Sequence, residues 1–60
     1  MSEKEKQLLH EFASSISKLK ININSEFSTT NNDYEVVTFV DEVVIYDIEE
    51  NIVISVSKEN

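Results

Sequence analysis

Glycine, proline, cysteine and tryptophan are all absent from this chain of 60 residues, and reading along it shows no arginine either. Without cysteine there can be no disulfide and no thiolate metal site to reinforce the fold. A domain of this size buries only about 60% of the surface that its unfolded chain exposes. Its stability must therefore come from a small, tightly packed core, or from burial against another chain.

Long hydrophobic runs are also missing. The chain starts with the charged, amphipathic stretch MSEKEKQLLHEF, which does not resemble a secretory leader. No stretch approaches the roughly 20 apolar residues that a membrane-spanning helix needs. We therefore expect a protein that makes no contact with membranes and works in the cytoplasm.

The amino-acid composition indicates what kind of genome encodes this chain. The missing Gly, Pro and Arg are encoded mostly by GC-rich codons, whereas the abundant Ile, Asn and Lys are encoded by AT-rich codons. This bias favours an AT-rich genome, such as that of a low-GC bacterium or one of its phages. The expected location is then the cytoplasm of a bacterial host cell.

Positive charge is scarce and is confined to the two ends of the chain. The five lysines are Lys4, Lys6, Lys18, Lys20 and Lys58. The stretch from residue 21 to residue 57 contains eight acidic residues and no lysine, although AT-rich coding favours lysine. Such a chain repels the phosphates of nucleic acids, so we expect no direct nucleic-acid binding and instead a basic protein partner.

The first third of the chain predicts an amphipathic helix over about residues 3–19. Ser2 and Glu5 have the spacing of a capping box, in which each side chain bonds to the backbone N–H of the other residue. An apolar arc with helical spacing follows, made of Leu8, Leu9, Phe12, Ala13, Ile16 and Leu19.

The remaining residues predict strands over about 21–27, 34–40, 43–48 and 52–57, because apolar and β-branched residues recur there with a period of two. Glu49-Glu50-Asn51 fits a three-residue hairpin loop with Asn51 in the left-handed conformation. Asp41-Glu42 fits an earlier two-residue turn, although one long bent strand over 34–48 is an alternative. The prediction is a single α+β domain over residues 1–60, with the helix packed on one face of a three- or four-stranded antiparallel sheet.

These turns would sort the strand residues onto two faces. The face toward the helix would carry Val37, Phe39, Val44, Tyr46, Ile48, Ile52, Ile54 and Val56. The outer face would carry Val36, Thr38, Val40, Val43, Ile45, Asp47, Val53, Ser55 and Ser57. The outer face would then be apolar enough to suggest a homodimer through that face or through an edge strand.

No pattern in the sequence points to catalysis. The single histidine, His10, falls opposite the apolar arc of the helix, and no nucleophile and base can be assembled around it. The carboxylates do not have the spacing of a calcium-binding loop. We expect no enzymatic activity, no cofactor and no metal.

The leading hypothesis is a phosphate-mimicking protein, of phage or mobile-element type, that inhibits or modulates a basic, nucleic-acid-handling partner. Carboxylates fixed on strands and turns could take the place of the phosphates of DNA on such a partner. The predicted contact residues are Glu35, Asp41, Glu42, Asp47, Glu49 and Glu50, with Val43, Ile45 and Val53 adding apolar contact. The alternatives are an antitoxin or immunity protein that neutralises a basic toxin, and a structural homo-oligomer whose acidity serves only solubility.

Overall fold

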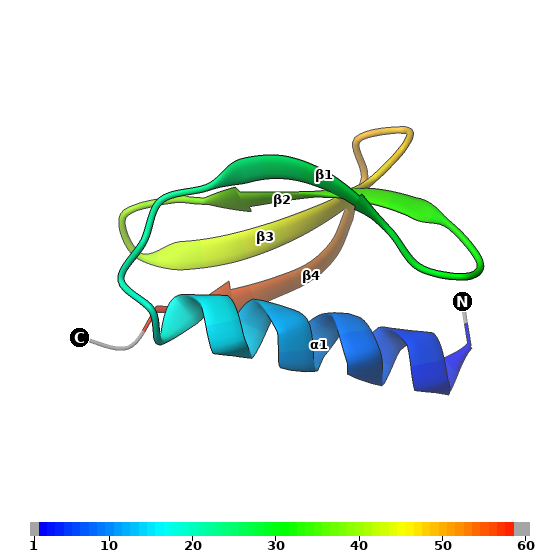
Figure 1. Ribbon diagram of the computed structural model, residues 1–60, viewed down its shortest axis with the longest axis horizontal. Helices are drawn as coiled ribbons and strands as arrows, with labels where there is room; N and C mark the ends of the chain where they lie inside the picture. The colour runs from blue at the N-terminus through cyan, green and yellow to red at the C-terminus, as the bar shows by residue number, and fades with distance from the viewer. Residues whose placement is uncertain (1, 59–60) are drawn as a thin grey trace.

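The computed structural model describes residues 2–58 and consists of one helix packed on one face of a four-stranded antiparallel sheet (Figure 1). The helix α1 spans Glu3–Ser17, and the strands are β1 (Asn24–Ser28), β2 (Asp33–Thr38), β3 (Glu42–Asp47) and β4 (Ile52–Ser57). The strands follow one another across the sheet in sequence order. The predicted α+β class, with a single helix on one face of an antiparallel sheet, is confirmed.

Both ends of the molecule gather loops from distant parts of the sequence. The β1–β2 and β3–β4 loops lie at the end where α1 begins, and the β2–β3 turn lies at the end where α1 finishes (Figure 1). Among the described residues 2–58, no helix has the length and apolarity needed to cross a membrane.

The two hairpin turns form one residue earlier than predicted. Phe39 donates its N–H to the Glu42 carbonyl at 2.7 Å, so the two-residue turn is Val40-Asp41 rather than Asp41-Glu42. In the β3–β4 loop, Glu50 rather than Asn51 takes the left-handed conformation, with φ at 65°. The region over 34–48 is therefore a hairpin, and the bent-strand alternative is wrong.

A β-bulge in the β3–β4 pair determines which side chains enter the core. Tyr46 pairs with Ile52, but its neighbour Ile45 pairs with Ile54, so Val53 is an additional residue in β4. The odd-numbered side chains of β3 thereby share a face with the even-numbered side chains of β4 beyond the bulge. The core is formed by Leu9, Ala13, Ile16, Tyr34, Val36, Val43, Ile45 and Ile54.

The predicted faces of β2 and β3 are therefore wrong, whereas Ile54 and Val56 of β4 do face the core. Val36, Val43 and Ile45 were expected on the outer face, and all three are buried under the helix. Phe39, Ile48 and Ile52 were expected under the helix, and all three are exposed. With the bulge, one face collects apolar rows from β2, β3 and β4, while Glu35, Ser55 and Ser57 turn outward.

The carboxylate of Glu5 ties the start of α1 to the β1–β2 loop. Ser2 does accept from the Glu5 N–H at 3.2 Å, as the capping box predicts, but the Glu5 side chain turns toward the sheet. Its oxygens accept from Tyr34 Oη at 2.6 Å, from Thr29 Oγ1 at 2.7 Å, and from the side-chain amides of Asn32 at 2.9 Å and Asn31 at 3.1 Å. Only 6% of Glu5 is exposed, so these four donors take the place of water around a buried charge.

This network shifts the pKa values of the Glu5 carboxyl and the Tyr34 hydroxyl. The hydrogen bond from Tyr34, followed by those from Asn32 and Thr29, lowers the pKa of Glu5 from 4.5 to about 2. Burial, followed by the bond to Glu5, raises the pKa of Tyr34. Both shifts keep Glu5 ionised and Tyr34 protonated, which is the pairing that the hydrogen bond requires.

The first prediction tests the location of the core. We expect Ile45→Val to lower the free energy of unfolding by about 1 kcal/mol, because it removes a buried methylene. The matched change Ile48→Val should leave the free energy of unfolding within about 0.5 kcal/mol of the parent, because 77% of Ile48 is exposed. Urea unfolding followed by circular dichroism measures both, and the reverse order would contradict the observed faces.

The second prediction concerns pH. The unfolded chain protonates Glu5 near pH 4.5 and the folded chain only near pH 2, so the contribution of the Glu5 charge to stability is fully present above pH 4.5 and is lost as the pH falls toward 2. Replacing Tyr34 by Phe removes the strongest of the four bonds and should raise the pKa of Glu5 in the folded protein. Carbon-detected NMR titration of the Glu5 carboxyl measures this pKa, with Tyr46→Phe as the control. A parent Glu5 that titrates near 4.5 would show that the network does not exist in solution.

Candidate functional site

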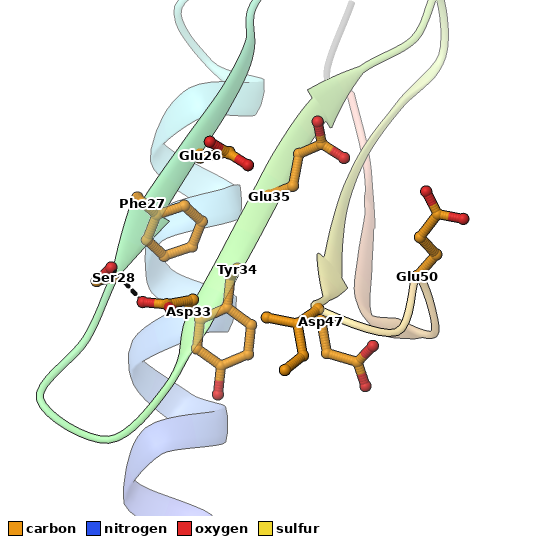
Figure 2. Close-up of a pocket in the computed structure, with 9 residues that line it drawn as sticks. Glu26, Phe27, Ser28, Asp33, Tyr34, Glu35, Asp47 and Glu50 are labelled. Carbon is orange, nitrogen blue, oxygen red and sulfur yellow. Dashed lines mark hydrogen bonds between the residues drawn. The ribbon is translucent and has the colours of Figure 1, made fainter.

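The carboxylates of the sheet gather mainly at the end of the molecule where α1 begins. A hollow of about 510 Å³ opens there and is lined by Glu26, Phe27, Ser28, Asp33, Tyr34, Glu35, Asp47, Ile48 and Glu50. Five of these nine residues are acidic, and we call this site the acidic hollow (Figure 2). In Figure 2, Glu26 lies on β1, Asp33 and Glu35 lie on β2, and Glu50 lies on the loop after β3, on the far side of Asp47.

Strand register brings two of the glutamates directly together. Glu26 of β1 pairs with Glu35 of β2, and Glu35 pairs in turn with Tyr46 of β3. Directly opposite side chains have Cβ atoms about 5 Å apart, and like charges at that spacing destabilise a sheet. The sheet thus accepts an unfavourable pair of negative charges on the face turned away from the helix.

Asp47 shapes the loop that carries Glu50. Its Oδ1 accepts from the backbone N–H groups of Glu49 and Asn51, both at 2.9 Å, and its carbonyl accepts from the Glu50 N–H at 3.0 Å. The bond from Asn51, followed by the one from Glu49, lowers the pKa of Asp47. The charge of Asp47 is therefore fixed in place by the turn and is only partly available to a ligand.

The other acidic side chains differ in whether their carboxylates accept hydrogen bonds from the protein. Asp33 accepts from Ser28 Oγ at 2.5 Å, and Glu42 accepts from Ser55 Oγ at 2.9 Å. Within residues 2–58, the carboxylates of Glu26, Glu35 and Glu50 are not drawn into bonds of this kind. These three are the side chains of the acidic hollow that are most available to a positively charged ligand.

Only part of the predicted contact set comes together. Glu35, Asp47 and Glu50 line the acidic hollow, and Glu49 lines an adjoining hollow of about 450 Å³ that shares Asp33, Tyr34, Asp47 and Ile48 with it. The remaining acidic members, Asp41 and Glu42, lie at the opposite end of β3. There the Asp41 carbonyl accepts from the backbone N–H of Lys58 at 2.9 Å, which brings a cation-bearing residue next to this pair.

The predicted apolar contacts are not available in this fold. Val43 and Ile45 are each 0% exposed and lie in the core, where the bulge in β4 places Ile54 on the same face as these two side chains. Val53 is half-buried and packs against the core. The exposed apolar side chain that lines the acidic hollow is Ile48, which was expected on the face toward the helix.

Two acidic residues of the hollow, Glu26 and Asp33, were not among the predicted contacts. Both belonged to the acidic stretch that the sequence showed, but their neighbours depend on strand register. The period of two would have placed Asp33 and Glu35 on the same face of β2. The pairing of Glu26 with Glu35 needs the exact length of the β1–β2 loop, which the residue types did not specify.

Across the described part of the chain, no three His, Asp or Glu side chains lie close enough together to hold a metal ion. The acidic residues of the hollow are instead spread over two strands, the end of a third and a loop. Residues two apart on a strand, such as Asp33 and Glu35, are separated by about 7 Å along it.

The chain was compared with protein families, curated proteins and solved structures. No family model matches it, and no curated protein or solved structure shows significant similarity to it.

Proposed function

We propose that this protein is a small, non-enzymatic binding protein that inhibits or modulates a basic, nucleic-acid-handling protein by presenting carboxylates in place of nucleic-acid phosphates. The observation that carries the proposal is the direct pairing of Glu26 with Glu35 in the acidic hollow. A lysine at either position would turn a repulsive cross-strand pair into an attractive one, and AT-rich coding favours lysine. A partner that supplies cations would offset the repulsion between the two glutamates.

The spread of the charges supports a protein partner. Carboxylates about 5–7 Å apart on a stiff sheet can each meet a different Lys or Arg side chain. Proteins that bind nucleic acids carry such cations in patches, because most of their polar contacts go to the phosphate backbone. The exposed side chain of Ile48 beside the carboxylates would contact the aliphatic stem of an Arg or Lys.

The positions of these side chains also bear on the two alternatives, a homodimer and an antitoxin or immunity protein. A homodimer through the outer sheet face loses its basis, because Val36, Val43 and Ile45 are buried in the core. It would also bring two acidic hollows toward each other. An antitoxin or immunity protein would use the same contacts, and the identity of the bound partner distinguishes it from an inhibitor of a host protein.

The third prediction identifies the partner and the mode of binding together. The immobilised protein should capture a basic protein from a low-GC bacterial lysate, and duplex DNA should release it by competing for the same cations. Mass spectrometry identifies the captured protein, and capture of a small basic toxin would assign the antitoxin role. Capture that duplex DNA does not displace would contradict phosphate mimicry.

The contact residues are tested with matched double variants. Glu26→Gln with Glu35→Gln should weaken binding to the captured protein by about tenfold, since each exposed ion pair contributes up to about 1 kcal/mol. It should also reduce the dependence of affinity on salt. The control, Glu3→Gln with Asp41→Asn, changes the net charge equally but leaves the acidic hollow intact. Equal affinity of the two double variants would place the contact elsewhere.

A further inference from the structure

We propose that α1 forms the interface of a two-fold symmetric homodimer, in which the helices of two copies pack antiparallel. The proposal goes beyond the binding role of the acidic hollow and concerns the helix rather than the outer face of the sheet. It starts from an apolar stripe that the fold leaves uncovered.

The helix buries only one edge of its apolar arc. Leu9, Ala13 and Ile16 enter the core, whereas Leu8 is 53% exposed and Phe12 is 38% exposed. Leu19, in the turn after α1, is 60% exposed. We call Leu8, Phe12, Ser15 and Leu19 the helix stripe.

The spacing of the helix stripe is that of a helix–helix contact. Its members are separated by four, three and four residues, which is the alternation that places side chains along the seam between two packed helices. Three of the four are large and apolar, and Ser15 is an exposed polar member near the middle. A surface helix with no partner would not need apolar residues at these positions.

An apolar groove runs beside the helix stripe. It has a volume of about 590 Å³ and is lined by Leu8, Leu9, Phe12, Phe27, Ser28, Thr29 and Thr30. It lies on the β1 side of α1, which itself packs mainly against β3 and β4, and there the ring centroids of Phe12 and Phe27 are 4.8 Å apart. The groove offers space next to the helix stripe for apolar side chains from a second helix.

The distribution of charge identifies the occupant as a second copy of this chain. Residues 1–20, which comprise α1 and the turn after it, carry three glutamates and four lysines and are the nearly neutral part of a strongly acidic chain. Contact through the helices buries the nearly neutral part of each copy rather than its acidic sheet face, which lowers the electrostatic cost of association. A basic partner, by contrast, is attracted to the acidic hollow rather than to this side.

The same charges select the antiparallel arrangement. Glu11 and Lys18 are both exposed and lie seven residues apart on one flank of the helix stripe. When two copies pack antiparallel with Leu8 beside Leu19 of the second copy, Glu11 of each lies near Lys18 of the other. Two-fold symmetry forms this ion pair twice. A parallel pair would instead set this flank against the flank that holds the buried Leu9 and Ile16, which offers no cation.

Charge reversal tests the interface without altering the core. Sedimentation equilibrium of the full chain should show a monomer–dimer equilibrium that Glu11→Lys weakens by roughly tenfold, and Lys18→Glu likewise. The double reversal Glu11→Lys with Lys18→Glu should restore the parent dimer to within about twofold. Glu3→Lys is the matched control, because it makes the same charge change on the side of α1 opposite the helix stripe and should leave the equilibrium unchanged.

A second variant tests the apolar part of the interface. Leu8→Ser should abolish the dimer while the circular dichroism spectrum stays that of the folded chain, because Leu8 is not part of the buried core. A parent chain that stays monomeric at its highest soluble concentration would overturn the proposal. A dimer that is insensitive to both Leu8→Ser and the charge reversals would also overturn it, since the contact would then lie on another surface.

Discussion

The additional residue in β4, Val53, is the feature on which the rest of the structure depends. It reverses the relation between the two faces of β3 and β4, so that Val43 and Ile45 share the core face with Ile54. Without the bulge, these two β3 side chains would share a face with Ser55 and would have to cover a partly polar surface. The bulge therefore lets a chain of this length assemble one continuous apolar face and turn its polar residues outward.

Two signals in the sequence were sufficient to anticipate the bulge. On β2, Asp33 and Glu35 indicate that odd positions face outward, and on β4, Ser55 and Ser57 indicate the same. A two-residue turn between β2 and β3 pairs even positions of β2 with odd positions of β3, whereas a regular three-residue loop between β3 and β4 pairs odd with odd. The odd positions of β2 and of β4 can both face outward only if one residue is added in the β3–β4 hairpin.

The elements themselves were easier to predict than their faces, because each depends on local pattern. The helix periodicity and the four β-rich segments identify the α+β class, and β4 occupies the range 52–57 that was expected. The turn at Asp47 was within reach as well, because Asp is favoured at the first position of such turns and its side chain can accept from the backbone two residues on.

Other contacts depend on the assembled fold. Glu5 meets Tyr34 across 29 positions of sequence, and its four bonds require the β1–β2 loop to fold over the start of α1. The pairing of Glu26 with Glu35 likewise follows from the register of β1 on β2. The local residue types carry no record of these distant neighbours. The sequence therefore predicts that this part of the chain is acidic, but not which of its acidic residues lie together.

The two carboxylate environments show how the fold treats negative charge. Glu5 is surrounded by four donors and has its pKa lowered to about 2, so its charge stabilises the fold above pH 4.5. Glu26 and Glu35 face each other and receive no comparable compensation. The chain thus has the means to neutralise a carboxylate with hydroxyl and amide donors, and it uses them for Asp33 and Asp47 of the acidic hollow but not for Glu26 and Glu35.

The acidic hollow and the helix stripe lie on different layers of the molecule, and this separation has a consequence for binding. The hollow opens among the sheet strands and the β3–β4 loop, and the helix stripe lies on α1. A dimer through the helices would therefore present two acidic hollows outward, one on each sheet.

Two linked sites raise the effective affinity for a partner that carries two basic surfaces, provided that the spacing allows both to engage at once. Nucleic-acid-binding proteins that act as symmetric dimers meet this condition, since they hold two cationic surfaces in a fixed relation. Dimerisation would then compensate for the limited area that one small domain can offer a partner.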